Sequence, residues 1–223
     1  MRHNRRERIR EIITILREKY PEANVTLDFW TPFQLLVATI LAAQSTDKKV
    51  NEVTPALFEK YPTPEDFARA NLQELEQAIH ATGFFRQKSR AIIEASQDIV
   101  NEHSGSVPET MEDLTKLRGV GRKTANVLLG NAFGKPAVIV DTHMLRVSGR
   151  LGLVDPALAG KKDADKVEEE LMKIVPQKDW TLFSHQIVAL GRDICTAKNP
   201  LHSACPILHL CPTGQSTLRP PDL

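Results

Sequence analysis

The chain has 223 residues, of which 41% are hydrophobic and 26% are charged, a composition typical of a globular protein. That length can bury an adequate core as one large domain or as two smaller lobes. No apolar run approaches the roughly 20 residues that a membrane span needs, and the basic start resembles an amphipathic helix rather than a secretory signal. The net charge of +1 neither demands nor excludes a nucleic-acid partner, since a balanced total can hide a basic surface.

Helical patterns follow one another along the chain. A capping-box pattern at Thr31 opens an apolar stretch, 33–43, that predicts a helix buried on most sides, and Thr63 repeats the start signal. Only Ala137–Val140 resembles a strand, and it is too short to build a sheet, while the residues from Pro212 onward predict a loose terminus. The pattern predicts an all-α fold. Further helices are expected at about 47–59, 74–81, 86–102, 110–116, 122–132, 141–150, 163–174 and 180–189.

The three cysteines, Cys195, Cys205 and Cys211, all lie in the last 29 residues. An odd number of cysteines clustered near one end, without a signal peptide, argues against a disulfide framework. The cluster therefore predicts an intracellular metal site.

A glycine turn lies in the segment Leu117–Ala125, between a short helical pattern and a longer one. Gly119 and Gly121 flank Val120, which would anchor the turn by pointing back into the two helices. The second helix would present unpaired backbone N–H groups and a positive dipole end, which suit a phosphate of nucleic acid. A lone Gly-x-Gly pattern also suits an ordinary helical hairpin.

Lys123 and Asp141 are the candidate catalytic residues. Lys123 begins the second helix of the hairpin, where the dipole and burial would favour a neutral amine that can attack a sugar carbon. Asp141 follows the short apolar run at a predicted helix start, where it could stabilise a cationic sugar and move protons. A solvated lysine and an N-cap aspartate are the simpler interpretations of each residue taken alone.

The run Leu117–Val127, followed by Val140–His143, is very similar to the helix-hairpin-helix, Gly/Pro-rich loop and aspartate signature of the endonuclease III family. Members are bifunctional DNA glycosylases with AP-lyase activity on oxidised pyrimidines, and the resemblance covers nearly the whole chain. It implies damaged double-stranded DNA as the substrate, a monomeric protein and a location in the bacterial or archaeal cytoplasm beside the nucleoid. Lys123 supports the lyase-competent branch, because the adenine glycosylases of the superfamily lack lysine at this place.

The resemblance also implies a two-lobed fold. A six-helix barrel over residues 25–135 would contain the hairpin at about 111–130. Residues 1–24 and 136–223 would form a second helical lobe that ends in a metal-cluster loop.

The same resemblance implies a set of DNA-binding residues. Gln44 lies where the family inserts a glutamine into the base stack, and Phe84 lies where an apolar side chain wedges the opposite strand. Without the family, Phe84 would be taken as a core aromatic. The other expected contacts, mainly with phosphates, are Lys88, Gly119, Val120, Gly121, Arg122, Thr142 and His143, with Arg86 and Arg146 as weaker candidates.

The carboxy-terminal loop matches the Cys-x6-Cys-x2-Cys-x5-Cys spacing with which family members hold a [4Fe-4S] cluster, except that His202 stands at the second cysteine. Cys195, His202, Cys205 and Cys211 could therefore ligate the cluster as a Cys3His set. They could instead hold zinc, for which Cys3His is an accepted structural set, or hold no metal at all.

The leading interpretation is thus a bifunctional glycosylase and AP lyase that uses a Lys123 Schiff base. One alternative is a monofunctional glycosylase for mismatched or adducted bases. Another is a non-catalytic protein that senses damage in DNA, although binding alone requires neither Lys123 nor Asp141.

Overall fold

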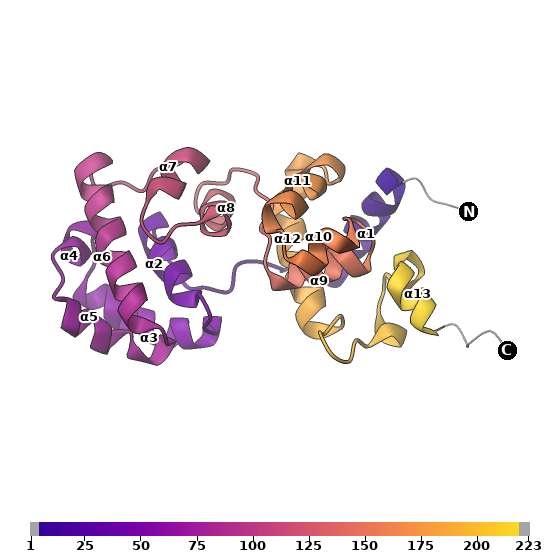
Figure 1. Ribbon diagram of the computed structural model, residues 1–223, viewed down its shortest axis with the longest axis horizontal. Helices are drawn as coiled ribbons and strands as arrows, with labels where there is room; N and C mark the ends of the chain where they lie inside the picture. The colour runs from indigo at the N-terminus through magenta and orange to yellow at the C-terminus, as the bar shows by residue number, and fades with distance from the viewer. Residues whose placement is uncertain (1–4, 219–223) are drawn as a thin grey trace. The chain divides into compact units, whose positions relative to one another are not determined.

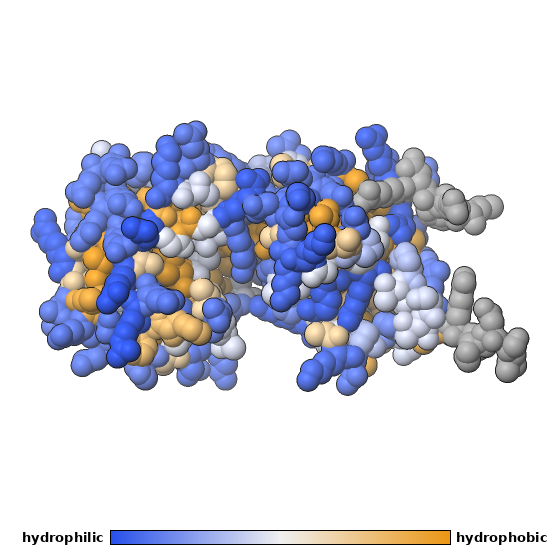
Figure 2. Space-filling view, viewed as in Figure 1, coloured by the Kyte–Doolittle hydropathy of each residue, from blue (hydrophilic) through white to orange (hydrophobic). Residues whose placement is uncertain are grey.

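The computed structural model describes residues 5–218, which fall into two compact units. One is Thr26–Lys135, and the other joins Met1–Val25 to Pro136–Leu223. No strand occurs among residues 5–218, so the all-α prediction is confirmed (Figure 1). None of the helices within these residues combines the length and hydrophobicity that crossing a bilayer requires. Hydrophilic residues cover much of the face seen in Figure 2, with hydrophobic ones between them.

The Thr26–Lys135 unit is built around helix α2, which packs against α3, α6 and α8. Helix α2 is buried on most sides, as its apolar stretch predicted. The Thr31 hydroxyl accepts the N–H of Gln34 at 3.2 Å, and the Gln34 side chain accepts the N–H of Trp30 at 2.8 Å. Two backbone N–H groups at the start of the helix thus have side-chain acceptors. The helices are α2 (Pro32–Ala42), α3 (Asp47–Lys60), α4 (Pro64–Ala68), α5 (Leu72–Ala78), the 3-10 turn η1 (His80–Thr82), α6 (Phe85–Glu102), α7 (Met111–Lys116) and α8 (Arg122–Asn131).

In the other unit, α9 and α12 pack together, α10 packs against α9, and α1 packs against α12. Fully buried side chains such as Phe183 and Leu171 fill the core. The elements are α1 (Arg5–Lys19), α9 (Thr142–Arg150), α10 (Pro156–Lys161), α11 (Ala164–Ile174), the 3-10 turn η2 (Gln177–Asp179), α12 (Trp180–Asp193), the 3-10 turns η3 (His202–Ala204) and η4 (Leu208–Leu210), and α13 (Pro212–Leu218).

Two segments differ from the prediction. The expected loose terminus is wrong for Pro212–Leu218, which form α13, because the Cys211 carbonyl accepts the N–H of Gln215 at 3.0 Å. Residues 219–223 lie outside the described part of the chain. Helix α10 was missed, although Asp155 caps it and proline follows at its first position, which is a recognised start signal.

Candidate functional site

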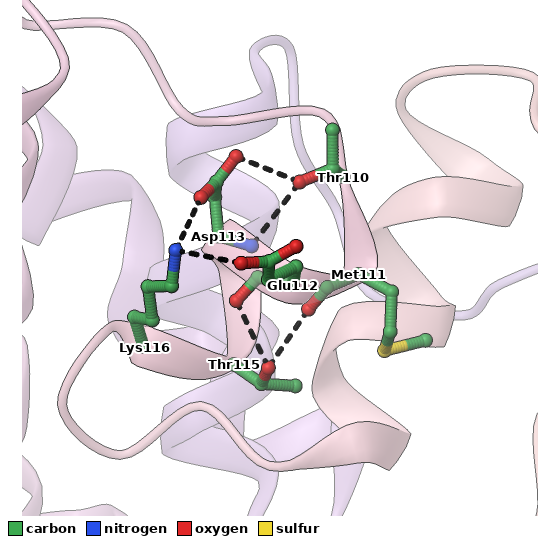
Figure 3. A network of polar contacts seen from close by, with 6 residues as sticks. All are labelled: Thr110, Met111, Glu112, Asp113, Thr115 and Lys116. Atoms are coloured by element: carbon green, nitrogen blue, oxygen red, sulfur yellow. Dashed lines mark hydrogen bonds and ion pairs between the residues drawn. The ribbon is translucent and has the colours of Figure 1, made fainter.

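The predicted hairpin is formed by α7, a glycine turn and α8. The first turn of α7 is closed by its own side chains (Figure 3). The Thr110 hydroxyl accepts the N–H of Asp113 at 3.1 Å and donates to its Oδ2 at 2.8 Å. Lys116 Nζ pairs with Asp113 Oδ1 at 2.9 Å and with Glu112 Oε1 at 3.2 Å. The start of α7 is therefore occupied by its own side chains and is a poor site for a ligand.

The turn between the helices is held against α6. Val120 is 5% exposed and its N–H donates to the Leu117 carbonyl at 3.1 Å, so the apolar residue between the glycines faces inward. Gly119 has a φ of +77°, and a Cβ there would stand 2.8 Å from the Ala91 Cβ of α6. Only glycine combines that conformation with so close an approach. Arg118 Nε also pairs with Glu94 of α6 at 2.8 Å.

The start of α8 is different from the start of α7. Gly121 is its N-cap and supplies no side-chain hydrogen bond to the first N–H groups. Gly121, Arg122 and Lys123 are all exposed. An exposed helix start with uncapped N–H groups is a ready site for an anion such as a phosphate.

Lys123 lies in the first turn of α8, next to this open start. Its side chain is exposed, so the expectation of a buried lysine is wrong. The feature that remains from the prediction is its place at the positive end of the helix dipole.

Asp141 belongs to the other unit, at the end of the extended and buried run Ala137–Val140. This run pairs with α12 rather than with a strand, because Ser184 Oγ accepts the N–H of Ile139 at 3.0 Å. The half-buried Asp141 is the N-cap of α9, where its Oδ1 accepts the N–H of Met144 at 2.8 Å. Asp141 is therefore an N-cap residue, and this hydrogen bond fixes its carboxylate at the start of α9.

Thr142 and His143 follow Asp141 in the first turn of α9. Thr142 is exposed, whereas His143 is half-buried with its Nδ1 3.1 Å from Arg146 Nη2. Burial lowers the pKa of His143, and the nearby Asp141 carboxylate only partly opposes this. The Arg146 guanidinium also donates to the carbonyls of Cys195 and Gly191 at 3.1 and 3.0 Å. Its Nε and Nη2 are therefore already hydrogen-bonded and do not face a phosphate.

The two residues expected to enter the base stack have the same unusual backbone. Gln44, which follows α2, has a φ of +53°, and Phe84, which precedes α6, has a φ of +49°. Gln44 is exposed, and the Phe84 side chain is 56% exposed, so the core interpretation of Phe84 is wrong. A left-handed conformation is costly for a non-glycine residue and is found mainly where function or packing requires it.

The phosphate contact predicted for Lys88 is not supported. Its side chain is 4% exposed, and Nζ donates to the carbonyls of Leu41 and Thr82 at 2.7 and 2.8 Å. A buried ammonium that is already hydrogen-bonded to two carbonyls cannot reach the DNA backbone. Burial also lowers the pKa of Lys88.

The carboxy-terminal loop brings the four predicted ligands around one small apolar space. Cys195, His202, Cys205 and Cys211 line it together with apolar residues of α9 and α12. Gly214 donates its N–H to Cys211 Sγ at 3.3 Å. Burial raises the pKa values of Cys205 and Cys211. Within residues 5–218, no three His, Cys, Asp or Glu side chains converge in a geometry suited to a single metal ion.

Sequence reasoning missed Arg150 at the end of α9. Its guanidinium donates to Cys195 Sγ at 3.3 Å and to the carbonyls of Thr196 and Ala197 at 2.7 and 2.9 Å. Its own carbonyl accepts from the Thr213 hydroxyl at 2.9 Å. Arg150 thus holds both ends of the cysteine loop. Nothing local in the sequence indicates these contacts, because the partners lie more than 40 residues away.

Comparison with known proteins agrees with this geometry. A family model described as the HhH-GPD superfamily base excision DNA repair protein matches residues 37–177, and the iron-sulfur binding domain of endonuclease III matches residues 195–211. The chain is 49% identical to endonuclease III of Synechocystis sp. over 215 residues, 96% of each chain. It is 44% identical to endonuclease III of Bacillus subtilis over 198 residues, 89% of each chain.

A solved structure is also similar to this chain. A structure of a trapped endonuclease III–DNA covalent intermediate superposes with a TM-score of 0.89 at 42% identity, covering 96% of this chain and 99% of that one. The chain therefore belongs to the endonuclease III family of the HhH-GPD superfamily, whose members are bifunctional DNA glycosylases and AP lyases for oxidised pyrimidines.

Proposed function

We propose that Lys123 is the nucleophile of this glycosylase and AP lyase, and that Asp141 assists it. The neutral Lys123 amine attacks C1′ of the damaged nucleotide, and the bond between C1′ and the base breaks with its electron pair leaving on the base. The product still carries the ring oxygen on C1′, so the C1′–O4′ bond breaks next, O4′ takes a proton, and a protonated Schiff base forms between C1′ and the lysine nitrogen. This Schiff base makes the C2′ proton acidic, and loss of that proton expels the 3′ phosphate by β-elimination. Asp141 stabilises the positive charge on the sugar and relays protons.

The observation that carries the proposal is the uncapped and exposed start of α8. The N–H groups beyond Gly121 bind a DNA phosphate, and this contact sets the register of Lys123 on the same helix turn. The exposed Arg122 adds positive charge beside it. Because phosphate contacts carry no sequence information, this element holds any duplex and leaves recognition of the lesion to other residues. Thr142 and His143, next to Asp141, make further DNA contacts.

Base recognition requires that the damaged nucleotide leave the stack. Gln44 fills the space that the extruded base leaves, and Phe84 wedges the opposite strand. Both side chains are exposed on left-handed residues, which suits groups that insert into DNA.

The two units correspond to two domains in this proposal. Residues 25–135 form the barrel domain with the hairpin at about 111–130, and residues 1–24 with 136–223 form the lobe with the cluster loop. The protein acts as a monomer in the cytoplasm of a bacterium or archaeon, where its DNA substrate lies.

The donor set of the carboxy-terminal loop fits a [4Fe-4S] cluster. Cys195, His202, Cys205 and Cys211 surround one apolar space, and N–H donors reach the sulfur atoms of Cys195 and Cys211. Such donors stabilise cluster-bound thiolates. We propose Cys3His ligation, in which the cluster shapes a DNA-binding loop and takes no part in cleavage.

Borohydride trapping tests the role of Lys123. Borohydride reduces a Schiff base to a stable amine, so the wild-type protein should become covalently attached to a duplex that contains dihydrouracil. Lys123→Ala should form no adduct and should lose β-elimination. Lys116→Ala is the matched control, because Lys116 is another exposed lysine of the hairpin and should leave trapping intact. Trapping by Lys123→Ala at the wild-type level would overturn the assignment.

Iron analysis tests the proposed ligation. Protein purified without oxygen should contain about four iron atoms per chain and absorb visible light as a cluster does. His202→Ala should lose iron readily, whereas His202→Cys should retain it at least as well as the wild type. Zinc in place of iron, or equal iron content in all three proteins, would contradict Cys3His ligation of a cluster.

A further inference from the structure

Lys88 lies in the first turn of α6 and joins two loops of the Thr26–Lys135 unit. Its Nζ donates to the carbonyl of Leu41, in the last turn of α2, at 2.7 Å. It also donates to the carbonyl of Thr82, at the end of η1, at 2.8 Å. The Leu41 carbonyl is one of the terminal carbonyls that a helix leaves without an intrahelical partner, and the negative end of the dipole favours a cation there. One ammonium group therefore closes the ends of two separate elements.

Burying an ammonium group to satisfy two carbonyls costs desolvation free energy. Lys88 is 4% exposed, and no carboxylate pairs with it among residues 5–218. It also stands at the start of α6, where the helix dipole disfavours a cation. Taking an ammonium out of water is unfavourable unless its donors are well satisfied. An apolar residue here would avoid the desolvation cost but would leave the carbonyls of Leu41 and Thr82 without this donor.

The two carbonyls lie just before the loops that present Gln44 and Phe84. Leu41 lies three residues before Gln44, and Thr82 lies two residues before Phe84, with Gly83 between them at a φ of +69°. Both exposed side chains thus sit on left-handed backbone immediately beyond a carbonyl that Lys88 holds. Strained residues of this kind persist only when the surrounding structure fixes them.

We propose that Lys88 is a positioning residue for base extrusion: its ammonium fixes the spacing between the Gln44 loop and the Phe84 loop, so that both side chains enter the duplex together. The inference rests on the proposed insertion roles of Gln44 and Phe84. Lys88 itself touches neither DNA nor the reacting atoms. Its effect should appear only in steps that require a base to leave the stack, because small misplacements at such sites are costly.

Two DNA substrates can distinguish a positioning role of Lys88 from a role in folding alone. Excision of dihydrouracil from duplex DNA requires extrusion, whereas β-elimination at an abasic site in single-stranded DNA requires none. Lys88→Met keeps most of the aliphatic stem but removes the donors. We expect it to lower duplex excision by about 100-fold while changing single-strand lyase activity by less than about twofold. Lys88→Arg keeps donors and charge and should recover most of the duplex activity.

Ile99→Ala is the matched control for stability. Ile99 is fully buried on the same helix, about three turns further along, and contacts neither loop through a hydrogen bond. Its loss should lower the melting temperature, and any fall in activity should be the same on both substrates. A fluorescent 2-aminopurine beside the lesion should report slower base extrusion in Lys88→Met but not in Ile99→Ala.

Variants of Gln44 and Phe84 distinguish the positioning role of Lys88 from the insertion roles on which it rests. Gln44→Ala and Phe84→Ala should show the same loss of duplex excision as Lys88→Met. If they lower duplex excision but Lys88→Met does not, the positioning role is wrong and the insertion roles stand. If neither of them affects duplex excision in an otherwise active protein, the insertion roles fail. An equal loss on both substrates for Lys88→Met, without rescue by Lys88→Arg, would show that Lys88 is only structural.

Discussion

The two helices of the hairpin begin in opposite ways. Helix α7 is capped by Thr110, whose hydroxyl accepts the N–H of Asp113 and donates to its carboxylate, and this carboxylate also pairs with Lys116 (Figure 3). Helix α8 begins at Gly121 without any side-chain cap. A capped start gains stability and loses the ability to bind an anion, whereas an open start keeps its N–H groups for a ligand. In the proposed function, the hairpin thus divides its two tasks: the capped α7 contributes stability and the open start of α8 binds DNA.

The turn that joins the helices should be the most sensitive position. Gly119→Ala places a side chain on left-handed backbone and drives its Cβ to 2.8 Å from the Ala91 Cβ, which cannot swing away because it has no side-chain torsion. We expect a loss of about 2–4 kcal/mol in the free energy of unfolding. DNA affinity should fall as well, because the turn orients the start of α8. Thermal melting and binding to a duplex with a tetrahydrofuran abasic analogue measure the two effects.

Gly160→Ala in α10 is the control for that substitution. A Cβ there meets nothing within 4 Å, and the backbone is helical, so alanine should maintain or raise stability. A melting temperature for Gly119→Ala equal to that of the wild type would mean that the turn and α6 can separate without cost.

Closing the open helix start should remove binding while leaving the fold intact. Gly121 has a φ of −91° and open space at its Cβ, so Gly121→Asp fits and caps α8, with a gain of only a few tenths of a kcal/mol. Its carboxylate would repel the phosphate, and DNA affinity should fall by about 10- to 100-fold.

Gly121→Asn separates the charge from the cap. Asparagine caps α8 equally well but is neutral, so its effect on DNA affinity should be much smaller than that of aspartate. Fluorescence anisotropy at two salt concentrations measures the difference. If aspartate and asparagine weaken binding equally, steric blocking rather than phosphate repulsion explains the loss.

Local patterns in the sequence predicted much of this molecule. The glycine turn, the helix start before Lys123 and the cap at Asp141 depend on neighbouring residues, and the structure has the expected helices at each. Lys88 was misassigned because its partners are carbonyls at Leu41 and Thr82, and backbone carbonyls leave no signal in sequence. The missed contacts of Arg150 with the cysteine loop have the same origin.

A substitution at the capped start of α7 should lower stability and leave DNA affinity unchanged, the reverse of what we expect at the open start of α8. Thr110→Val keeps the shape of the side chain but removes the hydroxyl, so we expect a loss of about 1 kcal/mol in the free energy of unfolding and no change in DNA affinity. Lys116→Ala is the comparison, because its ion pairs with Asp113 and Glu112 are exposed and should contribute little to stability.

The pH dependence of these two variants sharpens the test. Hydrogen bonds from Lys116 and Thr110 lower the pKa of Asp113, so the contribution of this carboxylate is present at neutral pH and is lost as the pH falls through its lowered value. Thr110→Val and wild type should therefore become more alike in acid, as should Lys116→Ala and wild type. If either variant weakened DNA binding at neutral pH, the start of α7 would contribute to binding, and the division between the two helices would be wrong.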